Sequence, residues 1–189
     1  ALAAATGARV IGAAADAHRL PRLDEKVAEG DIIRLGMEEG RVIDVPGHTV
    51  GHVAYHFPGS AAVFTGDSLM ALGCGRVFEG TMAQMWASLG KLAALPPDTL
   101  VCSGHEYTQS NARFALTIEP QNAALQARAE AVATARAEGR PTVPSALSEE
   151  IATNPFLRAG RPEIKRAMGM EGAPDAEVFA AIRQAKDRF

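Results

Sequence analysis

The sequence predicts an α/β domain followed by an all-helical domain. Residues 8–75 alternate short apolar runs with glycine, proline and aspartate, which is typical of strands joined by tight turns. From about residue 111 onward, alanine, glutamate, arginine and glutamine dominate, and these residues favour helices. In the first part, apolar runs repeatedly end at a glycine followed by histidine or aspartate. We therefore divide the chain into residues 1–110 and residues 111–189.

The expected elements follow from the hydrophobic pattern along the chain. Strands are predicted at residues 9–12, 31–35, 41–45, 53–57, 61–64 and 99–102. A helix is predicted at residues 82–94, with Thr81 as its N-cap and with Met85, Leu89 and Leu92 on one face. The second part should hold helices at 122–138 and 175–187, with a loop at 154–157 between them.

Composition narrows the classes of function. The formal net charge of −3 disfavours a general nucleic-acid or membrane-surface partner. No apolar run approaches the roughly 20 residues that a membrane span requires. Cys74 and Cys102 are too few for a disulfide framework, so we expect a reducing, cytoplasmic location. Nothing in the composition specifies an assembly, and we expect a monomer or a weak dimer.

Three strand ends suggest a metal site. In each case an apolar run stops at a glycine, and the next residue can bind a metal: His48, Asp67 and His105. Side chains at the ends of neighbouring strands can converge on one point, and glycine lets the backbone turn sharply there. Imidazole and carboxylate groups suit zinc and similar divalent ions. A single histidine is more often structural, and Asp67 alone would be a plausible turn cap, but three in one context favour a metal site.

The other histidines and Cys74 have simpler interpretations. His52 lies close to His48 and is a candidate for orienting that loop through hydrogen bonding. His56 is predicted to be a half-buried strand residue, and His18 to be on the surface. Cys74 stands in a glycine-flanked turn, where we expect it to pack rather than react.

Several motifs resemble a known family. Residues 46–52 (Pro-Gly-His-Thr-Val-Gly-His) are similar to the histidine loop of the metallo-β-lactamase superfamily, and residues 64–67 to the strand end that carries its bridging aspartate. Residues 73–76 (Gly-Cys-Gly-Arg) narrow the resemblance to glyoxalase II and its persulfide-dioxygenase relatives. Four further motifs look specifically like glyoxalase II (hydroxyacylglutathione hydrolase): residues 78–81, 104–108, 153–158 and 182–187. The resemblance implies a metallo-β-lactamase αβ/βα sandwich followed by a C-terminal helical domain.

The same resemblance implies a reaction and its cofactors. It is the hydrolysis of S-D-lactoylglutathione to D-lactate and glutathione, the second step of methylglyoxal detoxification, by a hydroxide held between two divalent ions. His48 would bind the first metal, His105 the second, and the catalytic Asp67 would bridge them. Zinc is the expected metal, with iron or manganese as alternatives.

The family match also implies a binding site for a glutathione thioester. Arg76 and Tyr107 would contact glutathione near the metals, whereas Arg183 and Lys186 would reach in from the helical domain, where their spacing places them on one helix face. Phe78 occupies a position where many relatives have tyrosine. Loss of that hydroxyl contact would weaken binding by about 0.5–1.5 kcal/mol.

One superfamily motif, Thr-His-x-His-x-Asp-His, is absent from the sequence. In the family it precedes a helix that resembles residues 1–7, so we expect the N-terminal part of the domain to be missing from this sequence. The remaining ligands are one histidine for each metal plus the bridge, whereas catalytic zinc normally has three protein ligands. We therefore expect the 189 residues alone to bind metal weakly and to hydrolyse little, and the full parent protein to be an active enzyme.

Two alternatives remain at this point. The chain would be a non-catalytic binder of glutathione conjugates if the parent gene encodes no upstream motif. It would be a persulfide dioxygenase with one iron if the parent oxidised glutathione persulfide and ignored lactoylglutathione. Residues 79–81, residues 106–108 and the long helical region favour the hydrolase.

Overall fold

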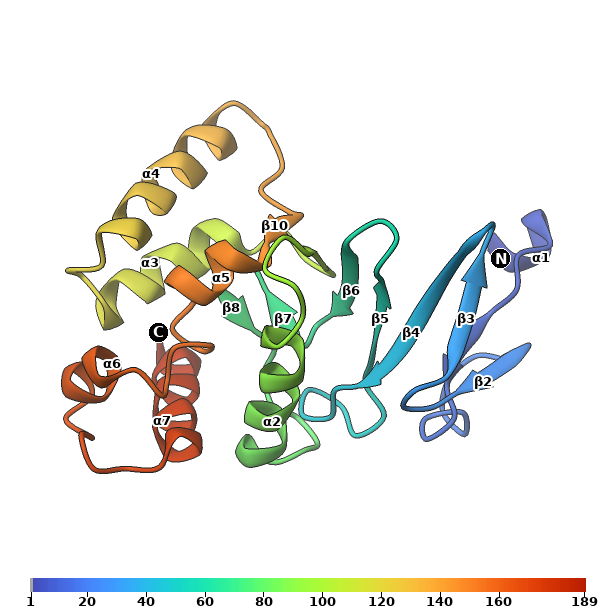
Figure 1. The fold of residues 1–189 in the computed structure, drawn as a ribbon, viewed down its shortest axis with the longest axis horizontal. Coiled ribbons are helices and arrows are strands. Elements are labelled where there is room, and N and C mark those ends of the chain that lie inside the picture. The colour runs from blue at the N-terminus through green and yellow to red at the C-terminus, as the bar shows by residue number, and fades with distance from the viewer. Residues whose placement is uncertain (1) are drawn as a thin grey trace.

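One mixed sheet forms the centre of the first region. In the computed structural model, which describes residues 2–189, its strands lie in the order β10-β9-β6-β5-β4-β3 (Figure 1). Their bounds are β3 (Ile32–Leu35), β4 (Glu38–Asp44), β5 (Val53–Phe57), β6 (Ala62–Gly66), β9 (Leu100–Ser103) and β10 (Ser145–Ala146). From β3 to β6 each strand is antiparallel to the next, whereas β9 is parallel to β6. The crossover between β6 and β9 contains α2 (Met82–Ala93), which places the ends of both strands at one edge of the sheet.

Smaller elements flank this sheet. α1 (Leu2–Thr6) is followed by the parallel pair β1 (Ile11–Ala13) and β2 (Glu25–Val27). After β6 the chain forms an antiparallel hairpin from β7 (Leu69–Met70) and β8 (Gly73–Cys74). This β7–β8 hairpin leads from the strand end at Asp67 toward the helical region.

The helical region lies at the opposite end of the molecule from the N-terminus (Figure 1). It contains α3 (Thr108–Ile118), α4 (Ala123–Ala137), α5 (Leu147–Thr153), α6 (Pro162–Ala167) and α7 (Asp175–Arg188). α3 packs on α4, and α7 packs on α2. None of the helices within residues 2–189 is long and apolar enough to cross a membrane.

A single apolar core joins the two regions. Val45, Val63 and Leu89 are fully buried in the cluster of side chains that also contains Phe156 and Phe179 of the helical region. Because this burial is continuous, the helical region is fixed against the sheet rather than attached by a linker. The position of α7 relative to the strand ends is therefore set by core packing.

The α/β class and the following helical region were predicted correctly, and several elements match closely. α2 begins after Thr81, whose side chain accepts a hydrogen bond from the Gln84 amide while the Gln84 side chain accepts one from the Thr81 amide. This capping box fixes the helix start. α4 likewise begins after Asn122, whose side-chain oxygen accepts from the Leu125 amide.

Other elements differ from the sequence prediction. The strand expected at residues 9–12 covers Ile11–Ala13, and the helix expected at 175–187 covers Asp175–Arg188. The pattern did not predict β2, β7, β8, β10, α3, α5 or α6, most of which are too short to show a hydrophobic period. β10 pairs with β9, so the region expected to be purely helical also supplies an edge strand.

Gly90 provides a test of the α2 assignment. It is exposed in the helix interior, and a methyl group there would meet no atom within 4 Å. Gly90→Ala is expected to raise the free energy of unfolding by about 0.4–1 kcal/mol, because the unfolded chain loses conformational freedom. Urea denaturation followed by circular dichroism measures the change.

The matched control is Gly139→Ala. Its new methyl group would also meet open space, but Gly139 has φ +70°, which strains alanine. This variant should be destabilised. Equal effects of the two substitutions would contradict a helical conformation at Gly90.

Candidate metal centre and substrate pocket

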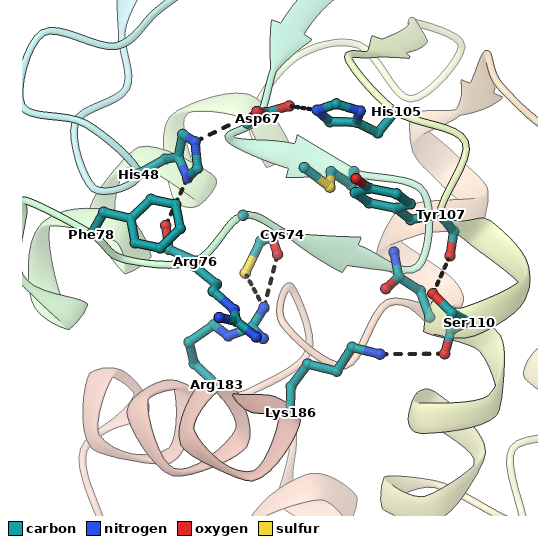
Figure 2. A pocket seen from close by; sticks show the side chains of 13 residues that line it. His48, Asp67, Cys74, Arg76, Phe78, His105, Tyr107, Ser110, Arg183 and Lys186 are labelled. Atoms are coloured by element: carbon teal, nitrogen blue, oxygen red, sulfur yellow. Dashed lines mark hydrogen bonds and ion pairs between the residues drawn. The ribbon is translucent and has the colours of Figure 1, made fainter. Parts of the chain in front are cut away.

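His48, Asp67 and His105 converge as the sequence predicted. Asp67 directly follows β6 and His105 follows β9, and the two strands are parallel neighbours, so both side chains emerge at the same sheet edge. His48 reaches this edge from the loop between β4 and β5. Figure 2 shows the Asp67 carboxylate between the two imidazole rings. His48 Nε2 lies 3.5 Å from Asp67 Oδ2, and His105 Nε2 lies 3.3 Å from Asp67 Oδ1.

The three side chains form two partial metal sites, here called half-sites, rather than one complete metal site. Each carboxylate oxygen of Asp67 faces a different histidine, and within residues 2–189 no group of three or more His, Cys, Asp or Glu side chains encloses a single position. The donor set of two imidazoles and a shared carboxylate fits a pair of borderline divalent ions. Each half-site therefore consists of one imidazole and one oxygen of the Asp67 carboxylate.

Hydrogen bonds orient two of the rings. His48 Nδ1 lies 2.8 Å from the Arg76 carbonyl oxygen, which accepts its proton and leaves the Nε2 lone pair toward Asp67. His52 Nε2 lies 3.1 Å from the Asp67 amide, and burial lowers the pKa of His52, which favours the neutral ring. A neutral His52 accepts the Asp67 N–H, in keeping with the orienting role expected from its position in the sequence.

Glu79 holds the His48 loop. Its Oε2 atom accepts from the Val50 amide at 2.9 Å and is bound by Arg19 at 2.7 Å. Hydrogen bonds from Arg19 lower the pKa of Glu79 to about 2, so the carboxylate is ionised at neutral pH. Glu79 belongs to the motif at residues 78–81, and that motif was the only signal of this contact in the sequence.

Glycines allow the backbone to approach the site closely. A methyl group on Gly75 would lie 2.0 Å from the Asp67 carbonyl oxygen, and one on Gly104 would lie 2.7 Å from Asp67 Oδ1. Gly75 therefore excludes a side chain for steric reasons, because the atom in the way belongs to the backbone. At Gly104 the atom displaced would be the end of the Asp67 side chain, which is able to rotate away.

An aromatic ring packs on each of the two histidines. Phe78 lies 5.1 Å from the His48 ring, measured between centroids, and Tyr107 stacks on His105 at 4.8 Å with an interplanar angle of 10°. Both aromatic side chains are largely exposed on their other sides. They form the rim between the metal centre and the adjoining cavity.

That cavity has a volume of about 540 Å³ and brings every predicted substrate-binding residue together. This volume is in the range of small-molecule sites. Figure 2 shows His48, Asp67 and His105 on one side and the side chains of α7, Arg183 and Lys186, on the other. Tyr107, Phe78 and Arg76 lie between them.

Arg183 is already engaged within the protein. It is only 4% exposed, its Nη1 donates to the Cys74 carbonyl oxygen at 2.8 Å, and its Nη2 donates to Asp187 at 3.1 Å. Asp187 also forms an ion pair with Arg76, whose Nε lies 3.3 Å from its Oδ1 atom. Asp187 was not among the predicted site residues, although its position four residues after Arg183 is the spacing of a helical ion pair.

Lys186 is the cation most affected by its surroundings. Its Nζ lies 5.1 Å from the centroids of both the Phe114 and Phe189 rings and donates to the Ser110 carbonyl oxygen at 3.3 Å. Burial, together with the nearby charge of Arg183, lowers the pKa of Lys186 to about 8. Cys74 is buried with a pKa raised by burial to about 11, which fits the packing role expected for it.

The comparisons with known proteins agree with this architecture. Residues 4–105 match the family model of the metallo-beta-lactamase superfamily, and residues 106–189 match the hydroxyacylglutathione hydrolase C-terminus. The chain belongs to the hydroxyacylglutathione hydrolase family. Its metallo-β-lactamase fold and helical C-terminal region are those that the sequence motifs predicted.

Close relatives in this family cover the whole chain. The hydroxyacylglutathione hydrolase of Cereibacter sphaeroides is 68% identical over 188 residues, and that of Jannaschia sp. is 67% identical over 189 residues. Each alignment covers 100% of this chain and 74% of the relative. Among solved structures, ETHE1 from Myxococcus xanthus superposes with a TM-score of 0.59 at 28% identity, covering 98% of this chain and 68% of that one.

Gly104 allows the shared carboxylate to be tested. Gly104→Ala is expected to weaken metal binding by roughly tenfold, because the methyl group displaces Asp67 Oδ1 from its position facing His105. Metal content by plasma emission after dialysis is the measurement, made on the protein at the length its gene encodes. Gly172→Ala, whose methyl group meets nothing within 4 Å, is the control. Unchanged metal content in Gly104→Ala would argue against Asp67 as a ligand.

Proposed function

We propose that the protein hydrolyses S-D-lactoylglutathione to D-lactate and glutathione, the second step of methylglyoxal detoxification. The observation that supports this most directly is the shared Asp67 carboxylate at the rim of a cavity whose opposite wall carries cations from α7. A thioester of glutathione carries its reacting carbonyl on the central cysteine and one carboxylate at each end of the tripeptide. The cavity offers metal-binding groups for the carbonyl end and, on the opposite wall, cations for a carboxylate.

Two divalent ions are the proposed cofactors, with zinc first and iron or manganese as alternatives. His48 and Asp67 would hold one, and His105 and Asp67 the other. When bound, such ions lower the pKa of a coordinated water and polarise a carbonyl oxygen. Because the described residues give each position two protein ligands where catalytic zinc usually has three, we propose that residues 2–189 alone bind these ions weakly.

The role proposed for each substrate-binding residue depends on how deeply its side chain is buried. Arg76 is exposed and Lys186 is half-buried, so both have donors available for the carboxylates of glutathione. Arg183 acts mainly by holding the Cys74 carbonyl and Asp187, which fixes the wall on which the substrate lies. Phe78 and Tyr107 each cover part of one histidine ring and form the rim between the two histidines and the cavity. Phe78 has no hydroxyl group to offer the substrate.

The hydrolase interpretation is preferred to the two alternatives. Relatives at 57–68% identity across the chain are named hydroxyacylglutathione hydrolase, and neither a dioxygenase nor a binding-only protein has comparable support. Both cysteines in the described residues are free, which is consistent with the cytoplasmic location we propose. We also propose a monomer or a weak dimer.

Asp67→Asn tests the reaction. The amide is neutral and a poorer bridging ligand, so kcat for S-D-lactoylglutathione should fall by about 100-fold or more, along with metal content. The assay is release of glutathione thiol by the protein at the length its gene encodes. Asp98→Asn, the same change at an exposed turn, should leave both quantities unchanged. An active wild type with full activity in Asp67→Asn would exclude the proposed site.

The depressed pKa of Lys186 predicts a pH dependence of substrate binding. Below about pH 8 Lys186 is charged and attracts a carboxylate, and above that pH it loses its proton. Affinity for S-methylglutathione, which cannot be hydrolysed, should therefore fall by about fivefold as the pH rises through that range.

Lys186→Arg supplies the control, because arginine remains charged throughout this range. The amino group of glutathione titrates identically for both proteins and cancels in the ratio of their dissociation constants. Isothermal titration calorimetry at a series of pH values gives that ratio. A ratio that does not change with pH would show that Lys186 does not contact the ligand.

A further inference from the structure

The turn of the β7–β8 hairpin is held by polar side chains from the helical region. Asn154 Nδ2 lies 3.1 Å from the Met70 carbonyl oxygen and 3.0 Å from the Gly73 carbonyl oxygen. Asn111 Nδ2 donates to another carbonyl of the turn, that of Ala71, at 3.0 Å. Asn154 is fully buried, and its Oδ1 accepts from the Phe156 amide at 3.0 Å. These contacts join residues more than 35 positions apart in the chain.

Glu150 also binds the turn of the β7–β8 hairpin. Its side chain is fully buried, and Oε2 accepts from the Leu72 amide at 2.8 Å and lies 3.1 Å from Asn154 Nδ2. Oε1 accepts from Ser145 Oγ at 2.6 Å and from Arg128, with which Glu150 forms an ion pair. All the acceptor sites of this carboxylate are therefore used inside the protein, as a buried charge requires.

The turn itself has an unfavourable backbone conformation. Leu72 has φ +55°, a region that non-glycine residues rarely adopt, and its side chain is fully buried against Leu125 and Ala115. Such a conformation persists only when its surroundings determine it strongly. Here the Leu72 amide is fixed by Glu150 and the flanking carbonyls by Asn154, so the helical region imposes the turn.

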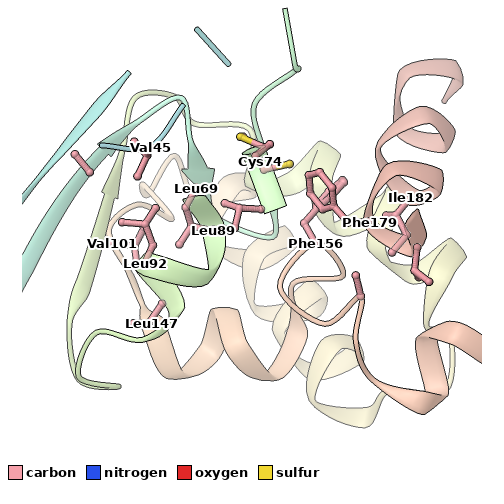
Figure 3. Packing of buried hydrophobic residues seen from close by; sticks show 14 of the residues in the cluster. Val45, Leu69, Cys74, Leu89, Leu92, Val101, Leu147, Phe156, Phe179 and Ile182 are labelled. Carbon is pink, nitrogen blue, oxygen red and sulfur yellow. The ribbon is translucent and has the colours of Figure 1, made fainter. Parts of the chain in front are cut away.

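The two ends of the same hairpin belong to the proposed site. Asp67 stands two residues before β7, and Gly75 and Arg76 directly follow β8. The Gly75 amide donates to the Ser68 carbonyl oxygen at 3.1 Å, which ties the ends together. Figure 3 shows Cys74 between Leu69 of the hairpin and Phe156 of the helical region, so the strands are also packed between the two halves of the core. A shift of the turn would thus move Asp67 and Arg76.

We propose that Asn154, together with Glu150, is a positioning residue for the hydrolysis: by fixing the β7–β8 turn it sets where Asp67 stands relative to Arg76. This inference rests on the proposed function and adds a role for the helical region beyond contact with the substrate. These hydrogen bonds give a structural explanation for the motif at residues 153–158. Asn154 supplies both donors that the Met70 and Gly73 carbonyls require.

Asn154→Ala and the milder Asn154→Ser test the proposal in the protein at the length its gene encodes. Both should lower kcat/KM for S-D-lactoylglutathione, Asn154→Ala by about tenfold or more, because small displacements of reacting groups strongly reduce rates. Asn154→Ser keeps one donor and should lie between Asn154→Ala and the wild type. Hydrogen exchange of the Leu72 amide should be faster in both variants. Kinetics are measured well below each melting temperature, so that loss of stability alone leaves kcat and KM unchanged.

Asn122→Ala is the matched control. Asn122 also caps a helix and donates to a backbone carbonyl, that of Ala152 at 3.1 Å, but has no bond to the hairpin. This variant should be destabilised while retaining wild-type kcat and KM and normal exchange at Leu72. Asn154 variants with wild-type kcat and KM, or an equal kinetic loss in Asn122→Ala, would overturn the inference.

Failure of the proposed function would give a different experimental result from failure of the positioning role of Asn154. A wild-type protein that does not hydrolyse S-D-lactoylglutathione would contradict that function directly. The positioning role would then be decided by the dissociation constant of S-methylglutathione. A constant raised in the Asn154 variants but not in Asn122→Ala supports the role of Asn154 in placing Arg76, whereas an unchanged constant, or no binding by the wild type, overturns it.

Discussion

The parallel pairing of β6 with β9 is the constraint on which the site depends. Parallel strands bring their carboxyl ends to one edge, so Asp67 and His105 meet although 38 positions separate them in the chain, the same separation as between the paired residues Phe64 and Cys102. The Gly104 amide donates to the Gly66 carbonyl oxygen at 2.8 Å, which continues the pairing beyond the strands to the ligands themselves. Backbone hydrogen bonds therefore bring Asp67 and His105 to the same sheet edge.

Much of this arrangement was predictable because it is local. The runs that end in Gly66-Asp67 and Gly104-His105 show both the strand and the turn in a few residues, and the capping box at Thr81 marks a helix start unambiguously. The predicted metal ligands and substrate-binding residues each lie in a short motif, so they too could be identified from the sequence. In the structure they line one cavity. The family resemblance supplied their roles, which the residues alone did not.

The parts that escaped prediction depend on distant contacts. The β7–β8 hairpin has only two residues in each strand, and its turn conformation at Leu72 is imposed by Glu150, which lies 78 residues away. Asp187 and Glu79 are ordinary charged residues in the sequence, and only the fold reveals that one joins two arginines and the other holds the His48 loop. No periodicity or spacing rule encodes such pairings, because they are set by tertiary packing.

Burial also explains how three cations share one pocket without equivalent roles. Arg183 is covered, stacks over Phe156 at 5.1 Å and is neutralised by Asp187, so its charge is compensated before any ligand arrives. Arginine suits that position because it cannot be deprotonated by burial, whereas lysine can be. Lys186, which lacks a carboxylate partner among the described residues, responds instead with a lowered pKa. Arg183, which stays charged, therefore supports the wall of the pocket. Lys186, whose charge depends on pH, faces the space where a carboxylate would enter.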